Sequence, residues 1–449
     1  MTLRATPKEQ RLNQFALLSQ RRFGPFFWTQ LSGAANDNLF KFALTVLLTY
    51  QLQLSWLKPE TSGLVIGALF ILPFVLFSAT SGQLADKYDK QTLMRAVKWL
   101  EVGIMALACI GFYTSGVTVL LVCIFLMGVH STIFGPAKYA YLPQHLSEQE
   151  LTGGNGMVEM GTFVAIVLGN VLGGLLVAIP GVGGRVAGLC CLALALIGRL
   201  AAQWIPRSPS ADPRLTINWN PFTETWRNLR LAKRDPTVFR ALLAISWMWF
   251  FGAVFLSLFP GFAKALLHGD EQVAAVLLVA FSLGIGTGSL LCETLSRGRV
   301  ELGLVPLGAL GMTIFSVDLY FASRGLPPVP LQSITQFLAL PAHWRVVSDL
   351  FLLALSAGLY SVPLYALMQL RTQASHRARV VAANNILNAL FMVVSAGLAG
   401  ALLGAGLTIA QVFLAVGLAN LAVTGTVFLL TPEYIARFKA LFQARSSSS

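Results

Sequence analysis

The sequence predicts an all-α membrane protein with 12 transmembrane helices, arranged as two six-helix halves. The composition is the first indication, because 55% of the 449 residues are hydrophobic and 11% are charged, whereas about 25% of the residues of a soluble domain are charged. The second is a series of apolar runs of about 20 residues, the length that crosses the hydrocarbon core as a helix. The third is the concentration of Lys and Arg in alternate connections between these runs.

Each predicted span is one apolar run, and the third and fourth are joined by a short turn at Thr114–Gly116. In chain order, the spans lie near residues 25–54, 61–84, 93–114, 116–135, 154–179, 183–205, 238–263, 272–292, 301–322, 346–369, 380–403 and 405–431.

The longest polar stretch between spans is Pro206–Asp235, and it divides the chain into two halves. We therefore predict an N-terminal half at residues 1–205, a linker at 206–237, a C-terminal half at 238–431 and a tail at 432–449. Within the linker, Pro221–Arg234 places Phe222 and Trp226 on one face with arginines beside them, a pattern typical of an amphipathic helix on a membrane surface. The alternative is a plain solvated linker.

The basic residues predict the orientation. Most of the 32 Lys and Arg residues precede the first span or lie in the central linker and in the connections after spans ten and twelve. The positive-inside rule then places both termini in the cytoplasm. Topology and anionic headgroups account for the net charge of +13,, so we expect no nucleic-acid partner.

The strongest local motif is GQLADKYDK at Gly82–Lys90, between the second and third spans. It resembles the loop signature of the major facilitator superfamily, Gly-x-Leu-Ala-Asp-Arg-x-Gly-Arg-Lys. Gly82, Leu84, Ala85 and Asp86 match this signature, Lys87 and Lys90 keep the charge, and Asp89 and Gln91 depart from it. The resemblance implies two parallel six-span repeats with the substrate site between them.

The residue types in this motif suit a latch between helices. Gly82 lets two helices approach, and Asp86 can accept hydrogen bonds from a neighbouring helix N-terminus or pair with a basic side chain. We predict that Gly82, Asp86, Lys87 and Lys90 form a gating motif that breaks and reforms as the halves rock. The alternative is an ordinary solvated loop.

Polar residues inside predicted spans are the candidates for substrate binding, because burying them in a membrane is costly. They are Asn36, Asp37, Asn38 and Lys41 in the first span, Lys138 after the fourth, Asn155 and Glu159 in the fifth, and Asn384 and Asn388 in the eleventh; Glu101 and Asp318 are secondary candidates. Two structural alternatives remain open. Asp37 and Lys41, four residues apart, can form an ion pair, and the amides can join neighbouring helices.

A closer resemblance follows from the segments SGAANDNLFKFAL, FILPFVLFSATSGQLADKYDK, STIFGPAKYAYLPQHL and GGNGMVEMGTF. Together they resemble the bacterial lysophospholipid transporter family, and in particular the transporter half of transporter–acyltransferase fusion proteins. The resemblance implies a lipid flippase of the inner membrane, surrounded by membrane lipids. It would move lysophospholipids such as lysophosphatidylethanolamine by alternating access, with a separate acyltransferase as partner.

Two departures refine this expectation. The acyltransferases need a His-x-x-x-x-Asp motif, in which His acts as a base, and no His here is followed five residues later by Asp; we therefore expect no enzyme activity. The seventh span has no basic residue between Arg240 and Lys264. A substrate phosphate would then depend on Lys41 or Lys138.

Other site chemistry is not indicated. The five cysteines and five histidines lack the spacing of metal ligands, and no Gly-x-x-x-x-Gly-Lys-Ser/Thr run is present to bind a nucleotide. We expect no metal and no cofactor, so transport is facilitated or ion-coupled. The alternatives are proton-coupled efflux of small amphipathic compounds, with Asp37 or Glu159 as the titrating acid, and a membrane scaffold for an acyltransferase.

Overall fold

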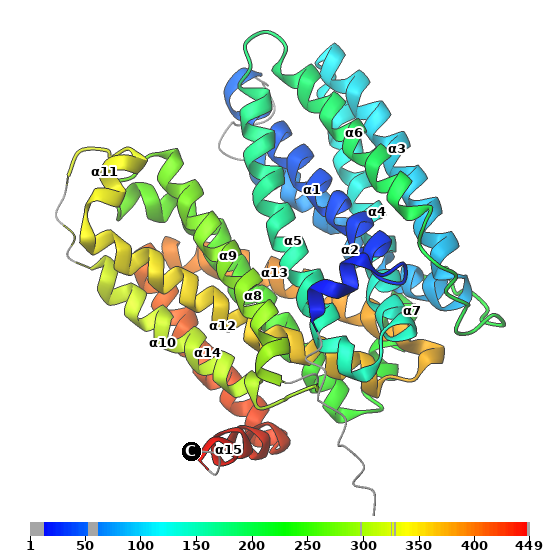
Figure 1. The fold of residues 1–449 in the computed structure, drawn as a ribbon. Coiled ribbons are helices and arrows are strands. Elements are labelled where there is room, and N and C mark those ends of the chain that lie inside the picture. The colour runs from blue at the N-terminus through cyan, green and yellow to red at the C-terminus, as the bar shows by residue number, and fades with distance from the viewer. Residues whose placement is uncertain (1–12, 53–61, 297–298, 325, 327–328, 447–449) are drawn as a thin grey trace, which may run out of the picture.

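The computed structural model describes residues 13–52, 62–296, 299–324, 326 and 329–446. The end of the first predicted span and the last residues of the predicted tail lie outside these ranges. In the described ranges, one helix of at least 20 residues corresponds to each of the twelve predicted spans (Figure 1). These helices are α1 (Gly24–Val46), α2 (Ser62–Lys87), α3 (Lys90–Thr114), α4 (Val117–His145), α5 (Glu148–Val177), α6 (Gly183–Ala202), α8 (Pro236–Ala265), α9 (Glu271–Ser296), α10 (Leu304–Ser323), α12 (Pro341–Arg371), α13 (Arg377–Gly404) and α14 (Ile409–Leu430).

Shorter helices lie at the ends of the long ones. They are η1 (Gln14–Ser19), η2 (Leu47–Gln51), α7 (Pro221–Ala232), α11 (Ile334–Ala339), η4 (Ala374–His376) and α15 (Glu433–Ser446). The α7 helix begins where Asn220 accepts hydrogen bonds from the backbone N–H groups of Phe222 and Thr223, which is the usual role of an N-cap asparagine. It buries Glu224 and Asn228 and exposes Phe222 and Trp226, so the amphipathic helix predicted in the linker is present.

Two helix ends differ from their predicted positions. The fourth span was expected to end near residue 135, but α4 continues through Pro136 and Pro143 to His145. Membrane helices tolerate proline because neighbouring groups satisfy the freed backbone carbonyls. The α5 helix begins at Glu148, ahead of the predicted 154, because Ser147 and Glu150 form a capping box,.

Ten of the twelve helices are long and apolar enough to cross a membrane by composition, in the part of the chain that the structure describes. The other two are α1 and α3. They carry Asn36 and Asp37, and Lys98 and Glu101, respectively. These polar and charged side chains lower the apolar content of both helices.

Small residues permit a close contact between α1 and α5 in the N-terminal half. A Cβ atom added at Gly169 in α5 would lie 2.5 Å from the carbonyl oxygen of Ala35, and one at Gly173 would lie 2.7 Å from that of Leu39. Both oxygens belong to α1. Only glycine permits this approach of two backbones, which is the usual basis of tight helix packing in membranes. The contact fixes α1, with its polar residues, against α5.

The helices form two bundles, α1–α6 and α8–α14, which meet at one end and diverge toward the other (Figure 1). We call the end where they meet the basic end; it includes the connections at residues 88–89, 146–147, 203–235 and 372–376 and the helix α15. Several side-chain hydrogen bonds between the bundles lie there. They join Gln14 to Leu290, Thr152 to Arg299, Asn155 to Gln369, and Asp86 to Ala378 and Arg379.

Candidate functional site

A cluster of buried polar side chains joins α1, α3 and α4 inside the N-terminal half. Glu101 is at its centre: one carboxylate oxygen accepts a hydrogen bond from Asn36 at 2.8 Å, and the other accepts one from Lys98 at 2.5 Å. The Nε2 atom of His130 lies 3.1 Å from that second oxygen. All four side chains are almost fully buried. A buried carboxylate needs partners of this kind because its charge would otherwise be strongly disfavoured.

Asp37 lies next to this cluster but is only half-buried. Its Oδ2 atom accepts a hydrogen bond from the Ser131 hydroxyl at 2.6 Å. Its Oδ1 atom has no hydrogen-bond partner among the described residues. A carboxylate oxygen without a partner, away from bulk water, is costly. Asp37 therefore has an acceptor site that a cationic ligand can fill.

Two lysines in the same half contact neutral groups rather than a carboxylate. The Lys138 ammonium lies 3.4 Å from the side-chain oxygens of both Gln30 and Thr162. The Lys41 ammonium lies 4.2 Å from the ring centroid of Phe70, a cation–π contact. In the described part of the chain neither lysine forms an ion pair, and both are half-buried.

An ion pair between Asp37 and Lys41, one of the two structural alternatives, is not formed among the described residues. Helical spacing brings the two residues to one face of α1, but each side chain contacts another helix instead. Ser131 of α4 binds the acid, and Phe70 of α2 lies against the ammonium.

Glu159 lies at the junction between the halves. Its Oε1 atom accepts a hydrogen bond from the Tyr139 hydroxyl at 2.6 Å. The Tyr139 ring stacks on the ring of Tyr365, from the other half, with centroids 4.8 Å apart and planes 1° from parallel. Trp249 of α8 donates to the Tyr365 hydroxyl at 3.0 Å. This acid is therefore tied to an aromatic contact that joins the two bundles.

The predicted asparagines have different partners. Asn155 and Gln369 exchange two hydrogen bonds, at 2.8 and 3.0 Å, between α5 and α12. Asn388 accepts one from Ser246 at 2.7 Å, between α13 and α8. Asn38 donates to the Ala34 carbonyl of its own helix, and Asn384 is fully buried in α13. The hydrogen bonds of Asn155 and Asn388 join helices, which is the second of the two interpretations that the sequence left open.

The predicted gating motif lies where α2 meets the N-terminus of α13. Asp86 is fully buried; its carboxylate accepts hydrogen bonds from the backbone N–H groups of Ala378 at 3.0 Å and Arg379 at 3.3 Å, and from Nε of Arg379 at 3.0 Å. A helix N-terminus favours such an anion. A Cβ atom at Gly82 would lie 2.9 Å from Cα of Arg379, so this glycine permits the approach.

The two lysines of the motif take no part in these bonds. The Lys87 ammonium lies 5.8 Å from the ring centroid of Tyr88. The Lys90 side chain is buried, and its ammonium has no hydrogen-bond partner among the described residues.

Several residues of these networks were not expected from the sequence. They are Lys98, His130, Ser131, Tyr139, Tyr365, Gln369 and Arg379. Lys98 and Glu101 are three residues apart in one apolar run, a spacing that allows them to pair, and this signal was available. The other partners come from helices far apart in the sequence, and their spacing carries no signal.

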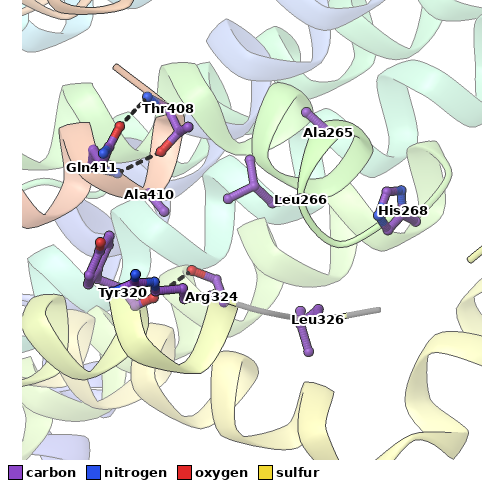
Figure 2. A pocket seen from close by; sticks show the side chains of 10 residues that line it. Ala265, Leu266, His268, Tyr320, Arg324, Leu326, Thr408, Ala410 and Gln411 are labelled. Carbon is purple, nitrogen blue, oxygen red and sulfur yellow. Dashed lines mark hydrogen bonds between the residues drawn. The ribbon is translucent and has the colours of Figure 1, made fainter. Parts of the chain in front are cut away.

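A hollow of about 390 Å³ lies at the opposite end of the C-terminal half, between the ends of α8, α10 and α14 (Figure 2). Its lining includes His268 and Arg324 but no carboxylate. Figure 2 shows Thr408 and Gln411 bonded to each other there, so their polar atoms already have partners. This hollow does not combine charges of both signs, unlike the region around Asp37 and Lys138.

Comparison with known proteins agrees with this architecture. The profile of the Major Facilitator Superfamily matches residues 26–396. The lysophospholipid transporter LplT of Enterobacter sp. (strain 638) is 27% identical over 405 residues, which cover 88% of this chain and 92% of that protein. The LplT of Salmonella paratyphi B is 30% identical over 357 residues, covering 77% and 79%. The crystal structure of the human organic anion transporter MFSD10 has a TM-score of 0.67 at 14% identity, and the match covers 97% of this chain and 100% of that one.

The superfamily match spans most of the chain, and the two bundles of the structure have the expected architecture. The chain is therefore a multi-pass membrane protein that belongs to the major facilitator superfamily, and within it to the family of the bacterial lysophospholipid transporters.

Proposed function

We propose that this protein moves lysophospholipids such as lysophosphatidylethanolamine across the bacterial inner membrane by alternating access. The observation that carries the proposal is the pair of incompletely satisfied charges of opposite sign in one half, Asp37 and Lys138. A zwitterionic headgroup needs an anion for its ammonium and a cation for its phosphate. The relatives named as lysophospholipid transporters support this choice of substrate.

The two halves suit the two parts of such a lipid. Between Arg240 and Lys264, α8 carries no charged residue, and its buried side chains are mainly aromatic and aliphatic. We therefore assign the headgroup to α1, α4 and α5 of the N-terminal half, with Asn36, Asn38, Lys41 and Glu159 near it. The acyl chain is assigned to the apolar side of the C-terminal half, near Asn384 and Asn388.

Transport itself tests this proposal. Purified protein in liposomes is expected to move labelled lysophosphatidylethanolamine, with proton and sodium gradients imposed separately to identify any coupling ion. Empty liposomes are the control. The alternative, proton-coupled efflux, would instead give movement of small amphipathic compounds that follows the pH gradient, with no movement of the lysolipid.

An acyltransferase that consumes the transported lipid remains a prediction.

We further propose that the basic end faces the cytoplasm, with both termini there. The distribution of Lys and Arg supports this orientation,. The bundles are joined at this end, so the described conformation would be closed to the cytoplasm and open to the periplasm. Tags at both ends and in the 206–235 linker should be protected from impermeant reagents in intact cells. Periplasmic labelling at any of the three would contradict the orientation.

The contact between Asp86 and α13 is expected to stabilise this closed state. The Asp86→Ala variant removes one acceptor group that serves two backbone N–H groups and Arg379. Since a charge-assisted hydrogen bond contributes roughly 1.5–3 kcal/mol, we expect at least about a tenfold loss of the closed population. Transport should fall while lysolipid binding remains.

Asp89→Asn is the matched control for that variant. Asp89 lies in the same Gly82–Lys90 segment but caps α3, accepting a hydrogen bond from the Gln91 backbone N–H, and asparagine caps a helix equally well. Distances between spin labels across the basic end measure the closed population. Normal transport by Asp86→Ala would reject the gating role.

A further inference from the structure

A second hollow, of about 630 Å³, lies at the basic end, between α7, the linker before it and the start of α13. Four arginines line it: Arg227, Arg230 and Arg234 in and after α7, and Arg379 in α13. Its lining includes one acid, Asp212. The recess therefore has a strong excess of positive charge, and it lies apart from the polar cluster of the N-terminal half.

Two of the four arginines already have acidic partners. Arg379 binds Asp86 and lies 3.5 Å from a carboxylate oxygen of Asp212, and Arg227 lies 3.7 Å from Glu224. Arg230 and Arg234 form no ion pair among the described residues. Their like charges point to an anionic ligand, and a guanidinium binds phosphate oxygens in a fixed, often bidentate, geometry.

The surroundings of the recess indicate where that phosphate comes from. Phe222 and Trp226 of α7 are 77% and 59% exposed, and Trp219, just before the helix, is 71% exposed. Exposed aromatic rings beside arginines on one short helix are typical of a segment lying in the headgroup region of a bilayer. A lipid phosphate at that level lies within reach of the recess, and basic segments of this kind attract anionic lipids.

Because of the position of α7, a ligand in the recess would contact elements of both halves. On one side α7 packs on α2, where the Asn228 side chain approaches the Ala79 carbonyl at 3.5 Å. On the other side the recess is closed by Arg379 of α13, the residue that binds Asp86. A phosphate held jointly by α7 and α13 would connect the two halves beside the Asp86 contact.

We propose that this recess binds the phosphate of an anionic phospholipid of the surrounding leaflet, such as phosphatidylglycerol, and that the bound lipid stabilises the closed basic end. The site is distinct from the substrate site. It is a regulatory lipid site, because its occupant stays in its own leaflet while the substrate crosses.

Direct binding is the first test. The full-length protein is purified in detergent, and bound phosphatidylglycerol is titrated by native mass spectrometry. The double variant Arg230→Gln/Arg234→Gln should bind it roughly ten- to a hundredfold more weakly, since it loses charge-assisted contacts. The matched control is Arg207→Gln/Arg214→Gln, which removes two exposed arginines of the same linker outside the recess and should bind normally.

The second test measures the closed state. Spin labels at Gln149→Cys and Gln373→Cys, both exposed at the basic end of opposite halves, are placed in a chain whose native cysteines are replaced. Vesicles containing phosphatidylglycerol should enrich the short distance relative to phosphatidylcholine vesicles, and the recess variant should lose this response while the control variant keeps it.

Three outcomes would overturn the proposal. Equal loss in both double variants would indicate diffuse surface charge. The same shift caused by inorganic phosphate in phosphatidylcholine vesicles would identify a soluble anion as the ligand. Binding that is unchanged in the recess variant would place the lipid elsewhere. Neither measurement uses transport, so such a failure leaves the proposed function unaffected.

Discussion

Replacing Asp37 by Asn is expected to weaken transport of lysophosphatidylethanolamine roughly ten- to a hundredfold more than transport of lysophosphatidylglycerol. Asparagine keeps an oxygen that can accept the Ser131 hydrogen bond, so the substitution removes the charge with little change in shape. The free Oδ1 atom is the acceptor that we assign to the substrate ammonium. Lysophosphatidylglycerol has no ammonium and should be far less affected.

Ser131→Ala is the control for this experiment. It removes the hydrogen bond to Asp37 and retains the carboxylate, so both lysolipids should be affected by a similar and smaller factor. Uptake of each labelled lipid into proteoliposomes is measured at several concentrations to separate affinity from rate. Equal losses for the two lipids in Asp37→Asn would show that this acid serves the structure rather than the headgroup.

Replacing Glu101 by Gln is expected to destabilise the protein by about 3–5 kcal/mol, because it leaves the Lys98 charge buried without its partner. Lys98 and Glu101 are both essentially inaccessible, and Asn36 and His130 provide no negative charge to replace the carboxylate. The free energy of unfolding in detergent micelles is the quantity to measure.

Two further variants make that result specific. Combining Glu101→Gln with Lys98→Met removes both charges, so it should recover part of the loss. Glu148→Gln, at an exposed acid in the first turn of α5, should change stability little. If the Glu101 and Glu148 variants are equally stable, the buried ion pair does not hold the three helices together.

The fold was predictable because its signal is local. A run of about 20 apolar residues specifies a span whatever it packs against, and each of the twelve runs corresponds to one long helix. Helix ends were less predictable. Pro136 normally disfavours a helix, yet α4 passes through it, since the surroundings decide whether the freed carbonyl finds a partner.

The site was predictable only as a set of residue types. Asp37, Lys138 and Glu159 were candidates because charge is costly inside a membrane. Their partners could not be predicted, because Ser131 reaches Asp37 from 94 positions away and the Tyr365 ring reaches Tyr139 from the other half. Helical spacing suggested Lys41 as the partner of Asp37. Spacing, however, describes contacts within one helix and cannot show whether a side chain from a neighbouring helix is the preferred partner.

The distribution of charge between the bundles has a consequence for the energy profile of the cycle. Asp37 with Ser131, and Lys138 with Gln30 and Thr162, lie wholly within the N-terminal bundle. A headgroup bound there would keep its electrostatic partners as the bundles tilt, so its desolvation cost arises at loading and at release. The barrier between loading and release would then come from breaking and replacing the contacts between the two bundles. These contacts join Asn155 to Gln369 and Asp86 to Arg379. The rate of reorientation would therefore depend weakly on the headgroup, whereas the affinity for each lipid would depend on it strongly.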